Sequence, residues 1–232
     1  MTGQTGDRRS QILAAAYRAI AREGVAAITT RKLAGEAGVN LATLHSLLGG
    51  KDALLLAVLE QVTGRMIDAL APPAQAHRGL RAALAESSAA LWTLTDREPR
   101  LPVVRCELLL YLLRRPAHAE EARVQQRRYL AALADLYRRC TASTDGSVSC
   151  PTLAQLVASQ VDGLALHNAF GEPGTLPRRT RTHALRAVSA LLEEAVPAAG
   201  GMPGSGNGTH RGTVRGHRSV ARGDAPAMDS PR

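Results

Sequence analysis

Residues 29–55 constrain the fold of this chain more than any other stretch. Two helix-sized segments flank a turn at Gly38, and a further helix begins at Lys51. Gly38 lies where the chain must reverse, and glycine adopts left-handed dihedral angles without the steric penalty of other residues. Asn40, which follows the turn, is a favoured helix N-cap. This layout predicts a helix-turn-helix, whose second helix enters the major groove of DNA.

Helical periodicity divides this stretch into an inner and an outer face. Thr29 or Thr30 can cap the first helix, and in the second helix Leu44 and either Leu47 or Leu48 face inward. A plain helical hairpin would use the same glycine and caps, so the spacing alone leaves that alternative open. The candidates for the outer face of the second helix are Leu41, Ala42, Thr43, His45 and Ser46.

Composition favours packed helices along the whole chain. Apolar residues make up 45% of the 232 residues and aromatic residues only 3%, so the core must be built mainly from Leu, Val, Ile and Ala. No segment of any length shows the alternation of a strand, and we expect an all-α fold of about nine helices. The segment 102–113 is apolar almost all round, which predicts a central position. Besides those within 29–55, the expected helices cover 8–23, Lys51 to Pro72-Pro73, about 77–96, 102–113, 117–140, 152–170 and about 178–195.

Charge and cysteine content narrow the class of protein. The formal net charge of +9 is compatible with a polyanionic partner. Cys106, Cys140 and Cys150 form an odd and sparse set, which is typical of a reducing cytoplasm. The longest apolar runs are too short to span a bilayer, and no signal-peptide pattern is evident. We therefore expect a soluble cytoplasmic protein with no membrane partner.

The sequence lacks the motifs of common enzymes. It has no metal-ligand spacing of His and Cys, no glycine-rich phosphate loop and no nucleophile elbow. We expect no catalytic residues, no metal site and no cofactor, and the chain is not expected to be an enzyme.

The composition changes sharply at Pro197. The 36 residues from there onward include eight glycines and four prolines and no aromatic residue. Such a segment cannot offset the entropy of ordering, so we expect it to be disordered. Its five arginines could add weak, sequence-independent contact with DNA, whereas the simpler interpretation is a solvated tail without a role.

Several short elements near the N-terminus occur in a characteristic order and spacing. They are Ile12-Leu13-Ala14-Ala15-Ala16, Gly24-Val25, Thr29-Thr30-Arg31-Lys32-Leu33-Ala34, Ala37-Gly38-Val39, Thr43-Leu44 and Lys51-Asp52-Ala53-Leu54-Leu55. In this order they resemble the tetracycline-repressor (TetR) family of bacterial transcription regulators, over about a quarter of the chain. Further on, Asp162-Gly163-Leu164 is similar to a common feature of the family's penultimate helix.

The resemblance implies a domain organisation and a function. It implies a helix-turn-helix DNA-binding domain over 1–55, a helical ligand-binding and dimerisation domain over 56–196 and the disordered Gly/Pro/Arg-rich tail over 197–232. The implied partners are a double-stranded DNA operator, a small-molecule effector and a second copy of the chain, paired through the helices at 152–170 and 178–195. The expected function is a ligand-responsive transcriptional regulator, a repressor released from a pseudo-palindromic operator by a lipophilic molecule.

Carried over residue by residue, the resemblance also implies individual DNA contacts. Thr30 and Arg31, at the start of the second helix, would meet a phosphate and a base edge, and an arginine can read guanine with two hydrogen bonds. Thr43 would contact the backbone or a base. Lys51, at the N-terminus of the fourth helix, would pair with a phosphate, aided by the helix dipole.

Three positions depart from the family's pattern. His45 replaces a frequent tyrosine that binds phosphate, Leu47 stands where histidine is common, and Leu48 stands where phenylalanine usually anchors the recognition helix. Gly49-Gly50 then loosens the connection to the next helix. The alternative is therefore a helical ligand-binding or scaffold protein whose helix-turn-helix has lost its affinity for DNA.

The resemblance further implies a ligand pocket among the helices that follow the DNA-binding domain. Each inward-facing candidate can instead simply fill the core, and His167 can lie in the dimer interface. Glu107 and Gln160 are additional polar candidates. The candidate ligand-binding residues are Trp92, Cys106, Tyr111, Tyr129, Leu133, Tyr137 and His167.

Overall fold

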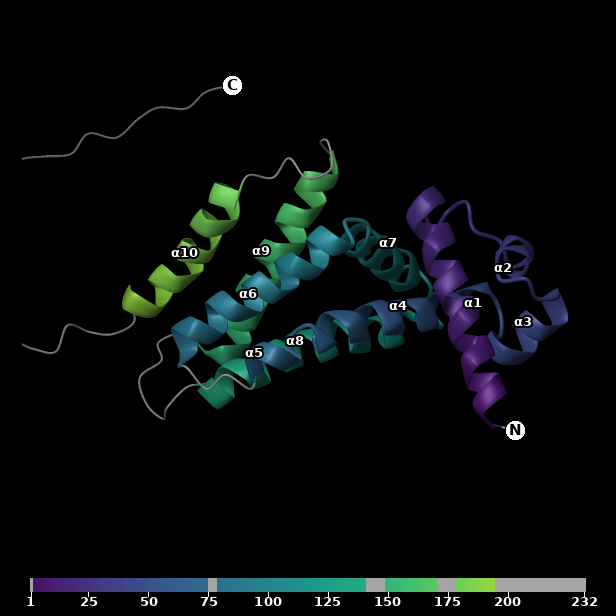
Figure 1. Cartoon of the computed structure of the whole chain (residues 1–232), viewed down its shortest axis with the longest axis horizontal. Helices are drawn as coiled ribbons and strands as arrows, with labels where there is room; N and C mark the ends of the chain where they lie inside the picture. The colour runs from purple at the N-terminus through teal and green to yellow at the C-terminus, as the bar shows by residue number, and fades with distance from the viewer. Residues whose placement is uncertain (1, 75–78, 141–148, 171–177, 195–232) are drawn as a thin grey trace, which may run out of the picture. The chain divides into compact units, whose positions relative to one another are not determined.

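The computed structural model describes residues 2–74, 79–140, 149–170 and 178–194, and every regular element in these ranges is an α-helix (Figure 1). The all-α class is thereby confirmed. About nine helices were expected; the described part of the chain has nine helices of seven or more residues and the four-residue α5. The helices are α1 (Thr2–Glu23), α2 (Thr30–Glu36), α3 (Leu41–Leu48), α4 (Lys51–Asp68), α5 (Ala71–Ala74), α6 (Leu80–Arg97), α7 (Leu101–Leu113), α8 (Ala119–Cys140), α9 (Cys150–Phe170) and α10 (Arg178–Glu194).

The described helices belong to one compact unit, Met1–Ala198. In Figure 1, α2 and α3 lie beside α1 at the end of this unit opposite α10. The tail predicted at 197–232 lies outside the described residues.

The first three helices and the first turn of α4 form a small N-terminal head. Its centre is made by side chains that are almost fully buried, among them Ile12, Ile20, Leu33 and Leu44. The head is held to the remaining helices because α1 also packs against α4 and α7. Helix α1 begins at Thr2, well before the expected residue 8, because the residues before Ile12 carry no apolar periodicity that a sequence pattern could show.

The turn between α2 and α3 has the predicted geometry. Gly38 has a φ of +64°, the left-handed conformation expected of it. At the two helix starts, the Thr29 side chain accepts a hydrogen bond from the Lys32 N–H at 3.2 Å, and the Asn40 side chain accepts one from the Thr43 N–H at 2.7 Å. Each cap satisfies a backbone donor that a short helix leaves unpaired, which stabilises it by about 1 kcal/mol.

The other helices pack around α4 and α8. Helix α4 packs against α7 and α8, α8 packs against α9, and α6 contacts α8, α9 and α10. Helix α4 ends at Asp68, so the Pro72-Pro73 pair does not end it directly as expected. Both prolines lie within α5, since the first turn of a helix needs no backbone N–H from them.

Helix α7 is less central than its composition predicts. It buries Leu108 and Leu112 completely, but the side chains of Leu110 and Leu113 are 54% and 39% exposed. The helix contacts α1, α4, α8 and α9, as expected of a central element, but these helices cover only part of its circumference. An apolar strip of α7 is therefore left open.

Among the described residues, no single helix is long and apolar enough to cross a membrane. Helices α3 and α4 meet such a length and composition test only as a pair bent by 61°. The described residues also contain no group of three or more His, Cys, Asp or Glu side chains placed to hold a metal ion.

A candidate DNA-binding head and a candidate effector cavity

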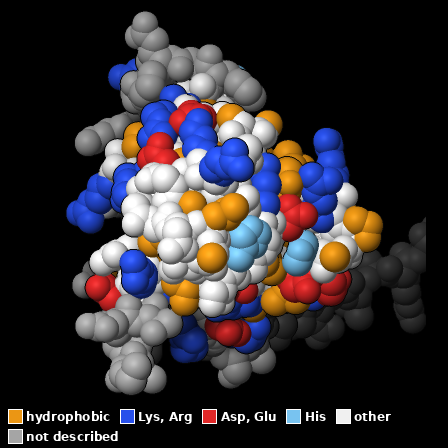
Figure 2. Space-filling model, turned by 90° about the vertical axis from the view of Figure 1, so that its right-hand side faces the viewer, with side chains coloured by type: hydrophobic (Ala, Val, Ile, Leu, Met, Phe, Trp, Pro, Cys, Tyr) orange, Lys and Arg blue, Asp and Glu red, His pale blue; other side chains and the backbone are white. Residues whose placement is uncertain are grey.

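The outer face of α3 contains most of the side chains predicted for it. Leu44 and Leu48 are buried, which settles the choice between Leu47 and Leu48, because Leu47 is only half-buried. Figure 2, which views the molecule from the side of the head, shows this region as largely uncharged, with most basic side chains toward its margins. On α3, Thr43 is half-buried, and the exposed residues are Leu41, Ala42, His45 and Ser46.

Cations of the head differ in whether they are already paired. Lys32 and Arg22 both form ion pairs with Glu23, and these contacts lower the pKa of the Glu23 carboxyl. Arg31, next to Lys32 on α2, is exposed and makes no ion pair with the described residues, and Thr30 beside it is half-buried. Arg31 is thus the cation of α2 that is available to a partner.

Lys51 is oriented differently from what its predicted role suggests. Its ammonium lies 3.5 Å from the carbonyl oxygen of Val25 and 5.3 Å from the centroid of the Tyr111 ring, so it is directed toward the α1–α2 connection and α7. The backbone around it is open to a ligand, because the N-cap Gly50 provides no side-chain hydrogen bond to the first turn of α4. The N–H groups of that turn have no capping side chain and can meet an anion.

Helix α7 is joined to the head by two polar contacts, which we call the head joint. The N–H of Val25 donates to Glu107 Oε2 at 2.9 Å, and the hydroxyl of Tyr111 donates to Asp52 Oδ1 at 2.9 Å. Arg115 donates to the Tyr111 hydroxyl from the next turn, also at 2.9 Å. Glu107 and Tyr111 were candidates for the ligand pocket; the structure places them in the head joint.

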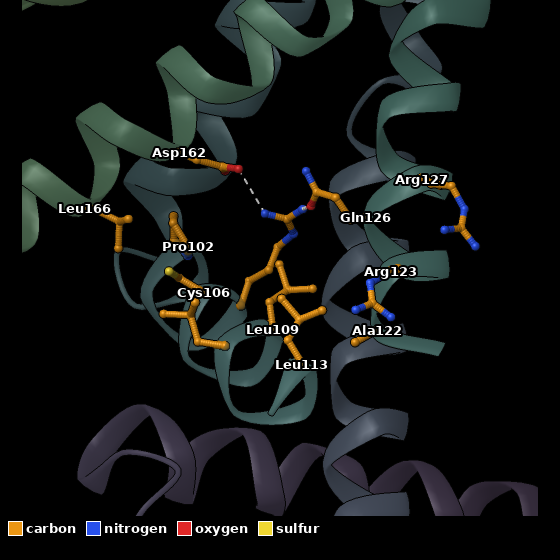
Figure 3. Close-up of a pocket in the computed structure, with 12 residues that line it drawn as sticks. Pro102, Cys106, Leu109, Leu113, Ala122, Arg123, Gln126, Arg127, Asp162 and Leu166 are labelled. Atoms are coloured by element: carbon orange, nitrogen blue, oxygen red, sulfur yellow. Dashed lines mark hydrogen bonds and ion pairs between the residues drawn. The ribbon is translucent and has the colours of Figure 1, made fainter. Parts of the chain in front are cut away.

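A cavity of about 450 Å³ lies between α7, α8 and α9 (Figure 3). Its volume is within the range of small-molecule sites. Its apolar lining consists of Pro102, Cys106, Leu109, Leu110, Leu113, Ala122 and Leu166. Its polar lining consists of Arg105, Arg123, Gln126, Arg127 and Asp162.

One end of this α7–α9 cavity is closed by a buried ion pair. Arg105 is only 3% exposed and donates to Asp162 Oδ2 at 3.0 Å, the contact drawn as a dashed line in Figure 3. Its guanidinium also bonds Gln126 and lies 4.9 Å from the centroid of the Tyr129 ring. Burial raises the pKa of the Asp162 carboxyl, while Arg105 acts in the opposite direction. The pair compensates a charge that could not otherwise be buried.

Of the seven residues predicted to bind the ligand, Cys106 lines the α7–α9 cavity. Burial raises the pKa of its thiol, so it is present as the neutral group. Trp92 is buried and stacked by the Arg181 guanidinium, 4.4 Å from the ring centroid, and His167 is exposed on α9. Tyr111 lies in the head joint, and the remaining three, which are fully buried elsewhere in the core, are Tyr129, Leu133 and Tyr137.

The two buried tyrosines have different surroundings. The Tyr137 hydroxyl lies 3.0 Å from Ser87 Oγ, and burial raises its pKa to about 12. The Tyr129 hydroxyl has no hydrogen-bond partner among the described residues, and burial raises its pKa strongly. Both phenols stay neutral at physiological pH.

The sequence analysis did not identify the polar lining of the cavity. Arg105 carried a signal that could have been used, since it is a charged residue on the buried side of a largely apolar helix and such a residue must find a partner. Arg123, Gln126 and Arg127 belong to a helix with many charged residues, and nothing in its pattern separates them from an ordinary solvated face.

Comparison with known proteins shows which family the head resembles. The family profile described as "Bacterial regulatory proteins, tetR family" matches residues 12–58, which span most of the head and the first part of α4. The nicotine-responsive transcriptional repressor HdnoR of Paenarthrobacter nicotinovorans is 23% identical over 169 residues, 73% of this chain and 87% of that protein. The transcriptional regulator BetI of Brucella suis biovar 1 is 26% identical over 175 residues, 71% of this chain and 81% of that protein.

A solved structure agrees in fold. A TetR-family transcription regulator from Marinobacter aquaeolei VT8 superposes with a TM-score of 0.63 at 20% identity, covering 82% of this chain and 98% of that one. The head, its profile match and the fold of the whole helical unit lead to the same assignment. The N-terminal head thus matches the TetR family of bacterial regulatory proteins, and the helical unit has the fold of a TetR-family transcription regulator.

Proposed function

We propose that this protein is a homodimeric repressor that binds a pseudo-palindromic operator and leaves it when a small molecule occupies the α7–α9 cavity. The head supplies the DNA contacts, the cavity receives the effector, and α7 connects the two. The response of the relative HdnoR to nicotine supports an effector of small-molecule size.

The observation that carries this proposal is the double role of α7. Arg105, Leu109 and Leu113 of this helix line the cavity, whereas Glu107 and Tyr111 form the head joint. A rigid helix cannot shift at one of these contacts without disturbing the other. A ligand that binds one position of α7 more tightly therefore changes the population of head positions.

The proposed DNA contacts follow from exposure. Arg31 reads a base edge, and Thr30 beside it meets a phosphate. Leu41 and Ala42 are exposed and small enough to touch thymine methyl groups. Thr43, His45 and Ser46 add hydrogen bonds from α3. A further phosphate lies at the uncapped N-terminus of α4, close to Lys51.

Dimerisation is proposed through α9 and α10. These two helices contact each other and both contact α6, so a partner that covers them would extend the same layer. An interface with two-fold symmetry presents two heads to the DNA, which requires an operator with two related half-sites about 34 Å apart.

The direct test is selection of bound fragments from the source genome, followed by a binding titration at several salt concentrations. We expect affinity to fall steeply as salt rises, because each phosphate contact releases counterions. Absence of any fragment bound above background at low salt would contradict the proposal.

A specific observation also favours a second candidate, a helical ligand-binding protein without DNA affinity. The exposed face of α3 has few hydrogen-bonding groups, and Lys51 is directed toward Val25 instead of outward. This candidate predicts ligand binding with no retained fragment in the same selection, so one experiment distinguishes the two.

A further inference from the structure

We infer that the α7–α9 cavity binds an amphipathic anion, a molecule with an apolar chain or ring and a single carboxylate. The inference rests on the proposed function, in which this cavity is the effector site. It specifies the chemical class of the effector, and it follows from how apolar and charged side chains are distributed over the lining.

The apolar part of the lining selects an apolar ligand body. Leu109, Leu113 and Leu166 face the hollow from α7 and α9, as Figure 3 shows. Leu110 and Leu113 are also two of the four large apolar side chains that are exposed in the described part of the chain. A ligand that covers them removes apolar surface from water, which stabilises the complex by about 25 cal/mol for each Å².

The charged part of the lining is unbalanced. It contains three arginines and one carboxylate, Asp162, whose charge is balanced by Arg105. The other two arginines, Arg123 and Arg127, share one counter-charge, Glu120, which does not line the cavity. The cavity therefore has an excess of positive charge, which favours an anion over a neutral or cationic ligand.

The carboxylate belongs beside Arg123 rather than at the Arg105 end. Arg105 is already bonded to Asp162 and Gln126, and Asp162 would repel a second carboxylate there. Arg123 lies next to Ala122 on the cavity side of α8 in Figure 3, while Arg127 extends away from the leucines.

The present partner of Arg123 can be replaced. Its contact with Glu120 is long, at 3.4 Å, and both side chains are more than half exposed. Such a surface ion pair contributes little to stability, so exchanging it for a ligand carboxylate loses little. The carboxylate then gains a charge-assisted hydrogen bond that an alcohol of the same shape cannot make.

The test compares three probes with one alkyl chain and different head groups: decanoate, 1-decanol and decyltrimethylammonium. Each is titrated calorimetrically into the full-length protein without DNA, the two ionic probes below their critical micelle concentrations and 1-decanol below its solubility limit. We expect decanoate to bind about tenfold more tightly than either of the others, and added salt to weaken decanoate alone.

Two variants locate the head group on the same helix. Arg123→Gln should lower the affinity for decanoate about fivefold and leave that for 1-decanol unchanged, because only the carboxylate uses the guanidinium. Arg138→Gln is the matched control, since Arg138 is exposed on α8, pairs with Asp135 and does not line the cavity. It should leave all three affinities unchanged.

Three results would overturn the inference: equal or tighter binding of 1-decanol or decyltrimethylammonium, an equal loss for all probes in Arg123→Gln, or no saturable binding of any probe. The titration contains no DNA, so it is independent of the operator experiment. If the protein binds decanoate but no operator, only the proposed function is contradicted. If it binds an operator but not decanoate, only this inference is contradicted.

Discussion

The N-terminal head and the α7–α9 cavity are built by contacts of different range. In the head, the decisive hydrogen bonds join residues three positions apart, Lys32 to Thr29 and Thr43 to Asn40. In the cavity, the decisive ion pair joins Arg105 to Asp162, 57 positions away. The head can therefore be identified from a short motif, whereas the cavity exists only once α7, α8 and α9 have packed.

The two regions also differ in how they hold charge. In the head, Glu23 and Glu36 pair with Lys32 and Arg22 at the surface, and Arg31 has no ion-pair partner among the described residues. In the cavity, Arg105 and Asp162 form a largely buried ion pair, and the remaining positive charge is on the exposed side chains of Arg123 and Arg127. A variant of the buried Arg105 should therefore act on stability, whereas a variant of the exposed Arg31 should act on recognition.

The largest effect is expected at the buried arginine. Arg105→Ala leaves the Asp162 carboxylate without its partner and removes packing on Tyr129, and should lower the free energy of unfolding by about 3 kcal/mol. Chemical denaturation measures this directly. The control, Arg138→Ala on exposed α8 surface, should change it by no more than about 0.5 kcal/mol. Similar losses in both variants would show that the ion pair has no special role.

The second effect concerns recognition. Arg31→Ala should cost about 1–3 kcal/mol of binding to the selected operator and relax the base preference at one position of each half-site. Its unfolding free energy should be unchanged, because Arg31 is exposed and unpaired with the described residues. Binding to a set of single-base operator variants measures the preference.

Lys51 provides the comparison within the head. Lys51→Ala should weaken binding to all DNA sequences alike and reduce the dependence of that affinity on salt concentration. For Arg31, the contradicting result is an Arg31→Ala variant that keeps the full base preference, because Arg31 would then not be the residue that reads a base.

The third effect tests the local geometry of the turn. Gly38→Ala should destabilise the protein by about 1–2 kcal/mol, because alanine is strained at a φ of +64°. The matched variant Gly35→Ala, in the last turn of α2 with free space around it, should stabilise by up to about 0.5–1 kcal/mol. Thermal unfolding of both variants checks the opposite signs. Equal signs would mean that loss of flexibility, and not the left-handed conformation, determines the effect.

These contrasts explain how much the sequence could predict. The caps at Thr29 and Asn40, the reversal at Gly38 and the buried face of α3 each depend on neighbours within a few residues, and the structure confirms them. The longer helices that follow the head were also predicted from the sequence, because a helix that buries one face repeats its apolar residues every three to four positions.

The α7–α9 cavity could not be predicted from the periodicity of the sequence, for a physical reason. Periodicity shows that Tyr129 and Leu133 face inward, but it does not show whether an inward side chain meets a neighbour or an open space. That depends on the distances between α7, α8 and α9, which the sequence pattern does not contain. Arg105 and Glu107, the two charges in the largely apolar α7, each signalled that a specific partner lay across from it.

The smallest effect is a pH dependence at Asp162. Burial raises the pKa of this carboxyl above its ordinary value of 3.8, so in the interval between the two pKa values the native protein holds a proton that the unfolded chain has lost. The free energy of unfolding should fall as pH rises through this interval. Asp162→Asn lacks the titrating group, and its stability should not show this fall.

The measurement is the difference in unfolding free energy between the natural chain and Asp162→Asn, taken from about pH 4 to about pH 7. Groups that titrate identically in both proteins cancel in this difference. Cys106 and Tyr129, whose pKa values are raised by burial, stay neutral in this range, so they add no slope. A difference that grows in favour of the natural chain as pH rises would mean that the attraction of Arg105 outweighs burial, and that the ion pair stabilises the fold more than its desolvation costs.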